Sequence, residues 1–468
     1  MVVQNNLAAM NANRMLGITQ GAQAKSSEKL SSGYQINRAA DDAAGLVISE
    51  KMRKQVNGLD RASTNAQDGV SAVQTAEGAL TEVHSMLQRM NELAVQAANG
   101  TNSQDDRNAI QAEVDQLLTE IDRVSETTKF NETYLLKGDA GLKDITMVGH
   151  DAGIKGTLTD GAATAEFVME VPVAGDTINI GGKEYTIGAQ VADAQGLITD
   201  STTSAKINGK DVTIVADYSA YGDDADAAHA AGAYTKAHAL ALIDGAGDSV
   251  EVAGKKLTVM TDVNAPTGID DTDTSIISAD KAKVLVKEAL TAANNVGATK
   301  TAATVEDAVA TTTADGKTGW KFTITKGTAE VANTLSFGLH VGADADLTNK
   351  IGVDIDTMST AGLGIQGLNV SDDSGIAATY AIDAITDALS KVSDQRSALG
   401  AIQNRLEHTI DNLDNVVENM TTAESRIRDT DMATEMVEYS KNNIIVQAGQ
   451  AILAQANQAG EGVLTLLR

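Results

Sequence analysis

The sequence predicts a multidomain protein in which an all-α, coiled-coil-like rod is built from both chain ends and β-rich α+β outer domains are inserted in the middle. Three features carry this prediction: heptad seams near both ends, alternating apolar and polar residues in the centre, and terminal segments that are almost uncharged. The chain has 468 residues, which is enough for several cores and roughly two to four domains.

The first long helix is expected from about Asp42 to Asn99, a run without proline and with few glycines. It would be roughly 85 Å long. Gly100 is placed to end this helix, and Ser103 or Asp105 to cap a second one. Apolar residues alternate in steps of three and four in both helices, first as Ala76, Leu80, Val83, Leu87, Met90, Ala94 and Ala97 and then as Ile110, Val114, Leu117, Ile121 and Val124.

The C-terminal part repeats this pattern from about Thr379 to Arg428, a helix of roughly 75 Å. Its seam includes Ile382, Ile385, Leu389, Val392, Leu399, Ile402, Leu406, Thr409, Leu413, Val416, Met420, Ala423 and Ile427. A helix of that length with a single apolar stripe cannot bury the stripe alone. We therefore expect the two chain ends to pack side by side.

The middle of the chain, residues 139–378, is predicted to be β-rich with helical inserts. Three segments alternate apolar and polar residues across a Gly-Lys turn, which is typical of a hairpin: INIGGKEYTI, AKINGKDVTIV and VEVAGKKLTV. Alanine-rich helical stretches are expected at Asp226–Leu242 and Ala279–Asn294. These segments indicate small repeated α+β modules, as many as two outer domains.

Composition excludes several classes of function. The net charge of -28 argues against nucleic acid or an anionic membrane as a partner. The absence of cysteine excludes disulfides, cysteine-ligated metals and thiol nucleophiles. The N-terminus lacks the basic and continuous apolar regions of a secretory signal, and no window reaches 18 uninterrupted apolar residues, so no membrane span is expected.

The chain shows no arrangement typical of catalysis. None of the six histidines stands in a HExxH spacing, and no nucleophile elbow, P-loop or dinucleotide fingerprint is found in a strand-to-helix context. Asp270, Asp271 and Asp273 offer carboxylates to calcium, but the run lacks the glycine and terminal glutamate of an EF-hand loop. A solvated acidic turn is the favoured interpretation. We expect no enzyme activity, no cofactor and no metal site.

The two extreme ends are almost free of charge. No charged residue lies between Lys441 and Glu461, and Arg14 is the only one in the first 24 residues. One interpretation is a pair of ordinary amphipathic helices that cap the rod. The other, which we favour, is that these segments stay disordered alone and fold against copies of themselves in an assembly, because repeated charges would repel in like-with-like packing.

The chain resembles bacterial flagellins. The resemblance rests on LSSGYQINRAADDAAGLVISEKMR, LQRMNELAVQAANGTNSQDDR and QAEVDQLLTEIDRVSETTKFN in the first part, and on IQNRLEHTIDNL, AESRIRDTDMATEM, QAGQAILAQANQ and LTLLR in the last. It covers roughly the first 140 and the last 90 residues, in the family's order. It implies a structural subunit that polymerises into the flagellar filament for motility.

The resemblance also implies a domain organisation. Residues 1–41 would be an N-terminal inner-tube helix and spoke, residues 42–138 outer-tube helices and residues 139–378 variable surface domains. Residues 379–430 would be the C-terminal outer-tube helix and residues 431–468 the C-terminal inner-tube helix. In the spoke, Ser32 and Gly33 would break the first helix and Asp41 or Asp42 would cap the second. The alternative for this segment is a flexible interdomain linker.

The family implies several partners. The chain would bind copies of itself through apolar residues of the terminal helices, namely Leu7, Ile445, Ile452, Leu453, Leu464 and Leu467. Hook-associated and cap proteins, the flagellar export apparatus and a flagellin chaperone are the other flagellar partners implied. Export would need no cleaved signal peptide, and the mature protein would be extracellular, in the flagellum.

A further implied partner is Toll-like receptor 5. The positions that match the family's receptor epitope are Arg89, Leu93, Gln96 and Glu113. Arg89 and Leu93 are four residues apart and share a helix face off the seam, so both are expected at the surface. The alternative is that this face contacts the next subunit of the filament.

Two other functions compete with a filament subunit. One is a hook-associated junction protein, which shares the terminal helices but does not propagate a filament. The other is an adhesin carried by the middle domains, for which Trp320, the sole tryptophan, provides little sugar-stacking surface.

Overall fold

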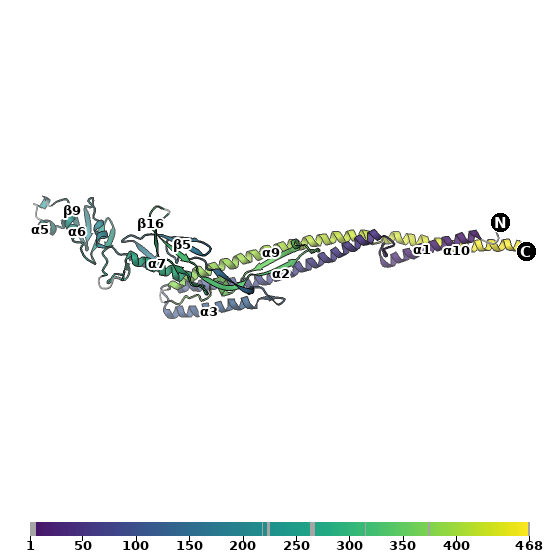
Figure 1. The fold of residues 1–468 in the computed structure, drawn as a ribbon, viewed down its shortest axis with the longest axis horizontal. Helices are drawn as coiled ribbons and strands as arrows, with labels where there is room; N and C mark the ends of the chain where they lie inside the picture. The colour runs from purple at the N-terminus through teal and green to yellow at the C-terminus, as the bar shows by residue number, and fades with distance from the viewer. Residues whose placement is uncertain are drawn as a thin grey trace. The chain divides into compact units, whose positions relative to one another are not determined.

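The computed structural model describes residues 6–217, 219–221, 225–262, 267–313, 315–372 and 375–466. Its long helices are α1 (Leu7–Ser32), α2 (Ala43–Ala97), α3 (Gln104–Thr127), α9 (Ile376–Arg428) and α10 (Met432–Leu466), and the strands lie between α3 and α9 in the chain (Figure 1). The chain divides into a terminal unit, residues 1–71, 337–353 and 401–468, and a central unit, residues 72–336 and 354–400. Both α2 and α9 contribute residues to each unit.

The long helices confirm the heptad prediction. The α2 seam from Ala76 to Ala97 is completely buried, and Leu399, Leu406 and Leu413 of α9 are buried as well. Beyond Leu413, Val416 is exposed, and the next seam positions of α9 are only partly covered. The apolar stripe of α9 is therefore fully covered over only part of its length.

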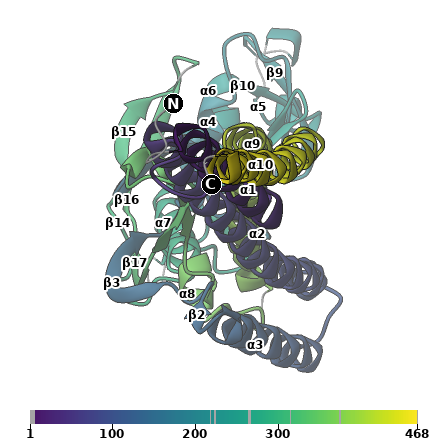
Figure 2. The same cartoon turned by 90° about the vertical axis from the view of Figure 1, so that its right-hand side faces the viewer.

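In the terminal unit, two helix pairs are stabilised by different contacts. The pair α1 and α10 lies side by side (Figure 2). The other pair, formed by α2 and α9, packs with strands β18 (Leu335–His340) and β19 (Lys350–Ile355) around a small core that includes Ala66, Ile351 and Leu406. The Ser63 hydroxyl donates to the Asp414 carboxylate at 3.0 Å, which joins α2 to α9 directly.

In the central unit, α3 begins at a capping box as the sequence predicted. The Asp106 backbone N–H donates to the Ser103 hydroxyl oxygen, and the Ser103 backbone N–H donates to the Asp106 carboxylate. The buried Arg107 guanidinium donates from Nε to the carbonyl oxygen of Ala97 at 3.0 Å. Because that carbonyl lies at the C-terminal end of α2, the cation is placed where the helix dipole favours positive charge.

Two hydrophobic cores organise most of the middle of the chain. The first is covered by α7 (Ala279–Asn294) and contains Phe167 and Phe322, whose ring centroids are 6.4 Å apart. Its strands form a sheet of order β14-β16-β5-β4, with β15 also paired to β16, and a sheet of order β13-β7-β6. The strands are β4 (Thr157–Asp160), β5 (Thr164–Glu170), β6 (Thr177–Ile180), β7 (Lys183–Ile187), β13 (Ile276–Ile277), β14 (Thr304–Val305), β15 (Val309–Thr312) and β16 (Thr318–Thr325).

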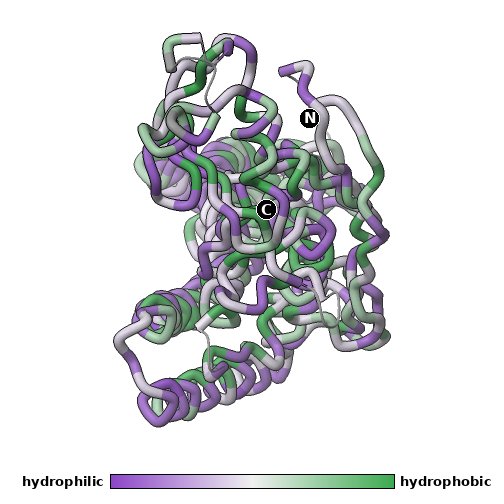
Figure 3. The backbone as a smooth tube through the Cα atoms, turned by 90° about the vertical axis from the view of Figure 1, so that its left-hand side faces the viewer, coloured by the Kyte–Doolittle hydropathy of each residue, from purple (hydrophilic) through white to green (hydrophobic). Residues whose placement is uncertain are grey.

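The second core belongs to residues 189–259 and contains one sheet of order β10-β9-β8-β11-β12. The sheet consists of β8 (Ser204–Ile207), β9 (Lys210–Val215), β10 (Ala233–Thr235), β11 (Ser249–Val252) and β12 (Lys255–Thr258), with α4 (Val191–Gly196), α5 (Ala225–Ala230) and α6 (Lys236–Ala241) beside it in the chain. Figure 3 shows hydrophilic and hydrophobic residues interspersed along the backbone trace.

All three predicted hairpins are confirmed as β6–β7, β8–β9 and β11–β12. The second and third share one sheet, so each hairpin is not a module of its own. The helical stretch expected at Asp226–Leu242 is confirmed only in part, as α5 and α6, because β10 interrupts it and pairs in parallel with β9. Gly232, with φ at 75°, ends the first helical piece, and the aromatic Tyr234 and the β-branched Thr235 then favour a strand.

Three further pieces complete the central unit. A short hairpin, β1 (Lys129–Phe130) and β2 (Thr133–Tyr134), follows α3. Strand β3 (Asp139–Thr146) pairs antiparallel with β17 (Thr328–Asn333) over the buried residues Met147, Ala329 and Val331. The short helix α8 (Thr360–Leu363) is tied to α3, because Thr360 donates from its backbone N–H and its hydroxyl to the Asp122 carboxylate at 2.8 and 2.9 Å.

Candidate functional site

The segment between α1 and α2 is hydrogen-bonded to the residues at the break between α9 and α10. Gly33, with φ at 78°, ends α1 in the left-handed conformation and donates its N–H to the Lys29 carbonyl. The Gln35 N–H donates to the Arg428 carbonyl at 2.7 Å, and the Thr430 N–H donates to the Gly33 carbonyl at 2.9 Å. These two backbone bonds join both breaks, which contradicts the alternative of a flexible linker.

Arg428 fixes this junction further with its side chain. The guanidinium lies 4.9 Å from the centre of the Tyr34 ring and forms an ion pair with Glu50 of α2 at 2.8 Å. Only 16% of the Arg428 side chain is exposed. No local pattern predicted this pair, because Tyr34 in LSSGYQINR and Arg428 in SRIRDTD lie far apart in the sequence.

The junction also positions the start of α2. The Asp42 carboxylate accepts from the backbone N–H groups of Ala44 and Gly45, so Asp42 is the cap that the sequence predicted. Asp41 instead accepts from Asn37 and Arg38 and pairs with Lys25 at 3.1 Å. The hydrogen bond from Lys25 is the main reason why the pKa of Asp41 is lowered.

The α1 and α10 pair has almost no core of its own. Among the described residues of these two helices, only Ser26 and Val446 are buried. Many large apolar side chains remain in solvent: Leu7, Met10, Met15, Ile18, Met436, Val437, Ile444, Ile445 and Ile452. Exposed large apolar side chains that gather on one helix pair are typical of a protein interface.

The predicted assembly residues differ in how exposed their side chains are. Leu7 is 70% exposed and Ile452 is 56% exposed, whereas Leu453 is partly buried. Leu464 lies in α10, but its side chain is outside the described part of the structure, as is the whole of Leu467. Met10, Ile18 and Ile444 were not singled out from the sequence, although helical spacing from Leu7 and Ile445 would have found them.

A cavity of about 410 Å³ lies between α1 and α10 and is lined by small and apolar side chains. Gly449 belongs to this lining, and a Cβ atom at that position would lie 3.3 Å from Cδ1 of Leu16. The two helices therefore approach closely without filling the space between them. Such packing is poor for an isolated helix pair.

The predicted receptor face lies where α2 and α3 meet in the central unit. Arg89 forms ion pairs with Glu113 of α3 at 2.9 Å and with Glu92 at 3.1 Å. The hydrogen bond from Arg89 to Glu113 is the largest of the effects that raise the pKa of the guanidinium. Gln96 and Glu113 are exposed, as the prediction required.

The prediction that Leu93 lies at the surface of this face is wrong. Leu93 is 2% exposed, so it does not present a surface as its position off the seam suggested. The reason is that α2 has two neighbours near its C-terminal end: Arg89 pairs with Glu113 of α3, and Gly375, directly before α9, lies next to the carbonyl oxygens of Ala97 and Ala98. A helix between two others buries a wider stripe than one heptad seam.

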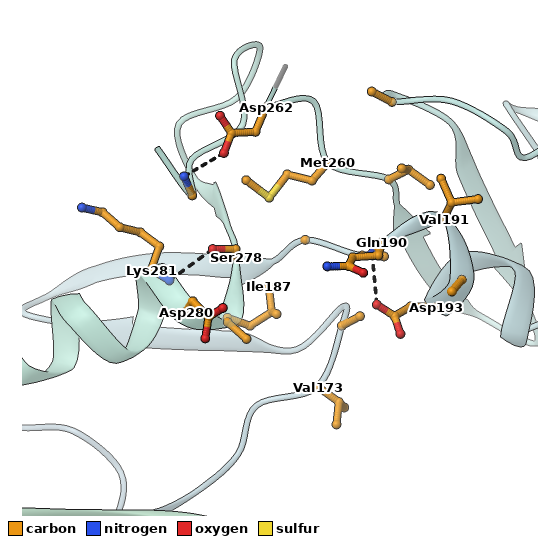
Figure 4. A pocket seen from close by; sticks show the side chains of 18 of the residues that line it. Val173, Ile187, Gln190, Val191, Asp193, Met260, Asp262, Ser278, Asp280 and Lys281 are labelled. Carbon is orange, nitrogen blue, oxygen red and sulfur yellow. Dashed lines mark hydrogen bonds between the residues drawn. The ribbon is translucent and has the colours of Figure 1, made fainter. Parts of the chain in front are cut away.

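A cavity of about 1130 Å³ lies elsewhere in the central unit (Figure 4). Its polar side chains are used within their own loops. The Asp193 carboxylate accepts from the Gln190 N–H, the Ser278 hydroxyl from the Lys281 N–H and the Asp262 carboxylate from the Gly268 N–H. The Asp193, Ser278 and Asp262 side chains are therefore held by backbone groups close to them in sequence.

The structure also changes the interpretation of two residues of the middle region, Asp270 and Trp320. Asp270 is 3% exposed, so its carboxylate is not solvated as predicted. Burial alone would raise the pKa of this carboxyl, but hydrogen bonds from Thr261 and Thr272 outweigh that effect and lower the pKa. These donors contact both carboxylate oxygens of Asp270. Trp320 is buried in the first core, with the Lys283 ammonium 5.2 Å from its ring centre, so it offers no exposed face for stacking on a sugar.

Long terminal helices that pair with each other and leave apolar faces in solvent define a structural, self-associating class of protein. The helices of the chain match two family models, the bacterial flagellin N-terminal helical region over residues 3–140 and the bacterial flagellin C-terminal helical region over residues 382–467. The chain belongs to the bacterial flagellin family.

Similar proteins extend over the whole chain. A flagellin of Clostridium tyrobutyricum is 39% identical over 462 residues, covering 98% of this chain and 99% of that protein. A flagellin of Halalkalibacterium halodurans is 34% identical over 468 residues, covering 100% of both. The solved structure of FliC from Burkholderia pseudomallei shares 20% identity, covers 72% of this chain and 99% of that one, and has a TM-score of 0.25.

Membership of the flagellin family makes the chain a structural subunit of the flagellar filament, an extracellular appendage for motility. The alternative of a hook-associated junction protein is not better supported, because the relatives that match end to end are flagellins. No helix in the described part of the chain is long and apolar enough to cross a membrane.

Proposed function

We propose that the exposed apolar side chains of α1 and α10 are the surface through which copies of this chain polymerise. The single observation that carries the proposal is the near absence of a core in this helix pair, whose described residues bury only Ser26 and Val446. Fully burying a large aliphatic side chain is favourable by about 1.5–3 kcal/mol. Neighbouring copies would supply the burial that the isolated pair lacks.

The charge pattern supports copies of the same chain as the occupant of this surface. Residues 442–460 carry no charge, so identical segments approach without like-charge repulsion. Leu7, Ile445, Ile452 and Leu453 contribute to this surface, together with the newly recognised Met10, Ile18 and Ile444. Leu464 and Leu467 remain predicted contributors.

The test compares point variants rather than truncations. Ile444→Gln and Ile452→Gln replace exposed apolar side chains with polar ones that a helix tolerates, and each is expected to raise the critical concentration for polymerisation. Gln455→Ala, at an exposed position of the same helix, is the matched control. Polymerisation of both isoleucine variants at the wild-type critical concentration would contradict the proposal.

We infer a second function, recognition of the monomer by Toll-like receptor 5 through the face of Arg89, Gln96 and Glu113. The supporting observation is that two carboxylates hold the half-exposed guanidinium in place, which lowers the entropic cost of using it in an interface. Leu93 lies beneath this face and supports it by packing. The same face as a contact to the next subunit stays the alternative.

Arg89→Ala is expected to weaken receptor signalling in a reporter assay, while Arg123→Ala leaves it unchanged. Arg123 is a suitable control because it is also an exposed arginine paired with a glutamate three residues away, Glu120. Both variants need matched far-ultraviolet circular dichroism. Equal signalling by the two variants would refute a receptor role for Arg89.

Family membership further supports export through the flagellar export apparatus, with a chaperone, and binding to hook-associated and cap proteins at the filament ends. We propose that export removes no signal peptide. Intact mass measurement of filament-derived protein is expected to match the encoded N-terminus, and a shortened N-terminus would overturn this.

A further inference from the structure

The sequence contains three Asn-Gly pairs, Asn57-Gly58, Asn99-Gly100 and Asn208-Gly209. In such a pair the glycine backbone nitrogen can attack the asparagine side-chain amide, because glycine carries no side chain to hinder the approach. The attack requires a side-chain amide nitrogen that is free to leave and a glycine N–H that is not held in another hydrogen bond. The three pairs differ in both respects.

Asn57 and Gly58 lie in the interior of α2. Their backbone is fixed by helical hydrogen bonds on both sides, so the glycine nitrogen cannot turn toward the side chain. Gly58 also packs against the segment after β18, where an added Cβ would lie 3.0 Å from the Cβ of Ala343. The helix and this close contact hold the pair in an unreactive geometry.

Asn208 and Gly209 form the two-residue turn of the β8–β9 hairpin, where both have positive φ, 49° and 78°. The Asn208 side chain is held at both ends. Its amide nitrogen donates to Asp248 at 2.8 Å, and its oxygen accepts from the Ser249 N–H at 2.7 Å. Both bonds must break before the amide can react.

Asn99 and Gly100 lie in the turn between α2 and α3, and both are exposed. The Asn99 side-chain oxygen accepts from the Thr101 N–H at 3.2 Å, a bond that folds the amide back over the Gly100 peptide and polarises its carbonyl. The Asn99 side-chain nitrogen and the Gly100 N–H have no hydrogen-bond partner among the described residues. Neither positive φ nor close packing constrains Gly100.

We propose that Asn99 is a site of spontaneous deamidation in the folded protein. The Gly100 nitrogen forms a bond to the Asn99 side-chain carbonyl carbon, the bond from that carbon to the amide nitrogen breaks, and ammonia leaves with the proton from Gly100. Water then opens the cyclic imide at either carbonyl and yields aspartate or isoaspartate. The reaction needs water alone and no oxidant or reductant.

The modification changes the turn that joins α2 to α3. Either product adds a negative charge just beyond the C-terminal end of α2, where the helix dipole disfavours it. Isoaspartate also lengthens the main chain of a turn in which the Asn99 carbonyl accepts from Asn102 at 3.1 Å. The neighbouring Asn102 side chain donates to the Gln96 carbonyl, so the change reaches the last turn of α2.

The experiment follows the three pairs in one sample of full-length monomer kept at mildly alkaline pH. Peptide mass mapping measures conversion of amide to carboxylate at each asparagine over time. In the folded protein, Asn99 is expected to convert at least about tenfold faster than Asn57 and Asn208, which corresponds to about 1.4 kcal/mol in activation free energy. In denaturant, the three rates are expected to converge.

Gly100→Ala is the matched variant, because an added Cβ meets no atom within 4 Å and Gly100 does not have positive φ. It is expected to slow conversion of Asn99 and leave the other two sites unchanged. Asn99→Asp supplies the charged product directly, and hydrogen exchange in residues 94–104 is expected to be faster in it than in wild type. A folded-state rate at Asn99 no faster than at Asn57, or one unaffected by Gly100→Ala, would overturn the proposal.

Discussion

Replacing Arg428 by alanine is expected to loosen the junction of the two helix breaks without unfolding the central unit. The lost cation–π contact with Tyr34 is worth about 0.5–2 kcal/mol. The ion pair with Glu50, whose side chain is half exposed, adds at most about 1 kcal/mol. We therefore expect a local destabilisation of about 1–3 kcal/mol.

Hydrogen exchange measures this effect at the amides that join the breaks, Gln35 and Thr430. A loss of about 1–3 kcal/mol predicts exchange roughly 5- to 150-fold faster if these amides exchange by local opening. Arg428→Lys is expected to lie between wild type and alanine, because lysine keeps the charge but not the planar stacking.

Arg426→Ala is the matched control, since Arg426 is an exposed arginine on the same helix, two residues earlier. Its exchange at both amides is expected to equal that of wild type. If Arg428→Ala and Arg426→Ala gave the same exchange rates, the stacked arginine would not hold the junction, and the two backbone bonds would suffice.

Three further outcomes are expected. Phe322→Ala removes a fully buried ring that packs on Phe167, and should destabilise the central unit by about 3–5 kcal/mol in a chemical denaturation curve; a loss below 1 kcal/mol would contradict the assigned core. Gly33→Ala places a Cβ in the left-handed region and should cost about 1–2 kcal/mol in the terminal unit, seen as faster exchange of the Thr430 amide. Burial raises the pKa of the Asp383 carboxyl, because the ionised form is poorly solvated in the folded protein. The free energy of unfolding is therefore unaffected by this group below the ordinary carboxyl pKa, and it falls as pH rises through the raised pKa of the folded state. Asp383→Asn should therefore raise the melting temperature near neutral pH and flatten its fall between mildly acidic and neutral pH, whereas an unchanged profile would refute the assignment.

The helical part of the fold was readable from the sequence because its signals are local. Heptad spacing predicted the buried seam from Ala76 to Ala97, and Ser103 and Asp42 were recognisable as caps. The hairpins were equally readable, but the turn of the second is formed by Asn208 and Gly209, one position before the predicted Gly-Lys turn, because both residues have positive φ and Lys210 already belongs to β9. Each of these features depends on residues close in sequence.

The features that were missed depend on partners distant in sequence. Leu93 is buried because α3 and the start of α9 both flank α2, which a single helix pattern cannot reveal. Asp270 is buried because hydroxyl donors surround it after folding. The stacking of Arg428 on Tyr34 joins residues that lie at opposite ends of the sequence, and neither residue carries a local signal for the other.

Seeded polymerisation observed by electron microscopy tests the central claim most directly. Purified protein is mixed with short filament fragments, and wild type is compared with an Ile444→Gln/Ile452→Gln double variant and with Gln455→Ala. We expect long filaments from wild type and Gln455→Ala, and helical monomers from the double variant at the same concentration. Filaments of normal length from the double variant would show that the exposed apolar faces of α1 and α10 do not drive assembly.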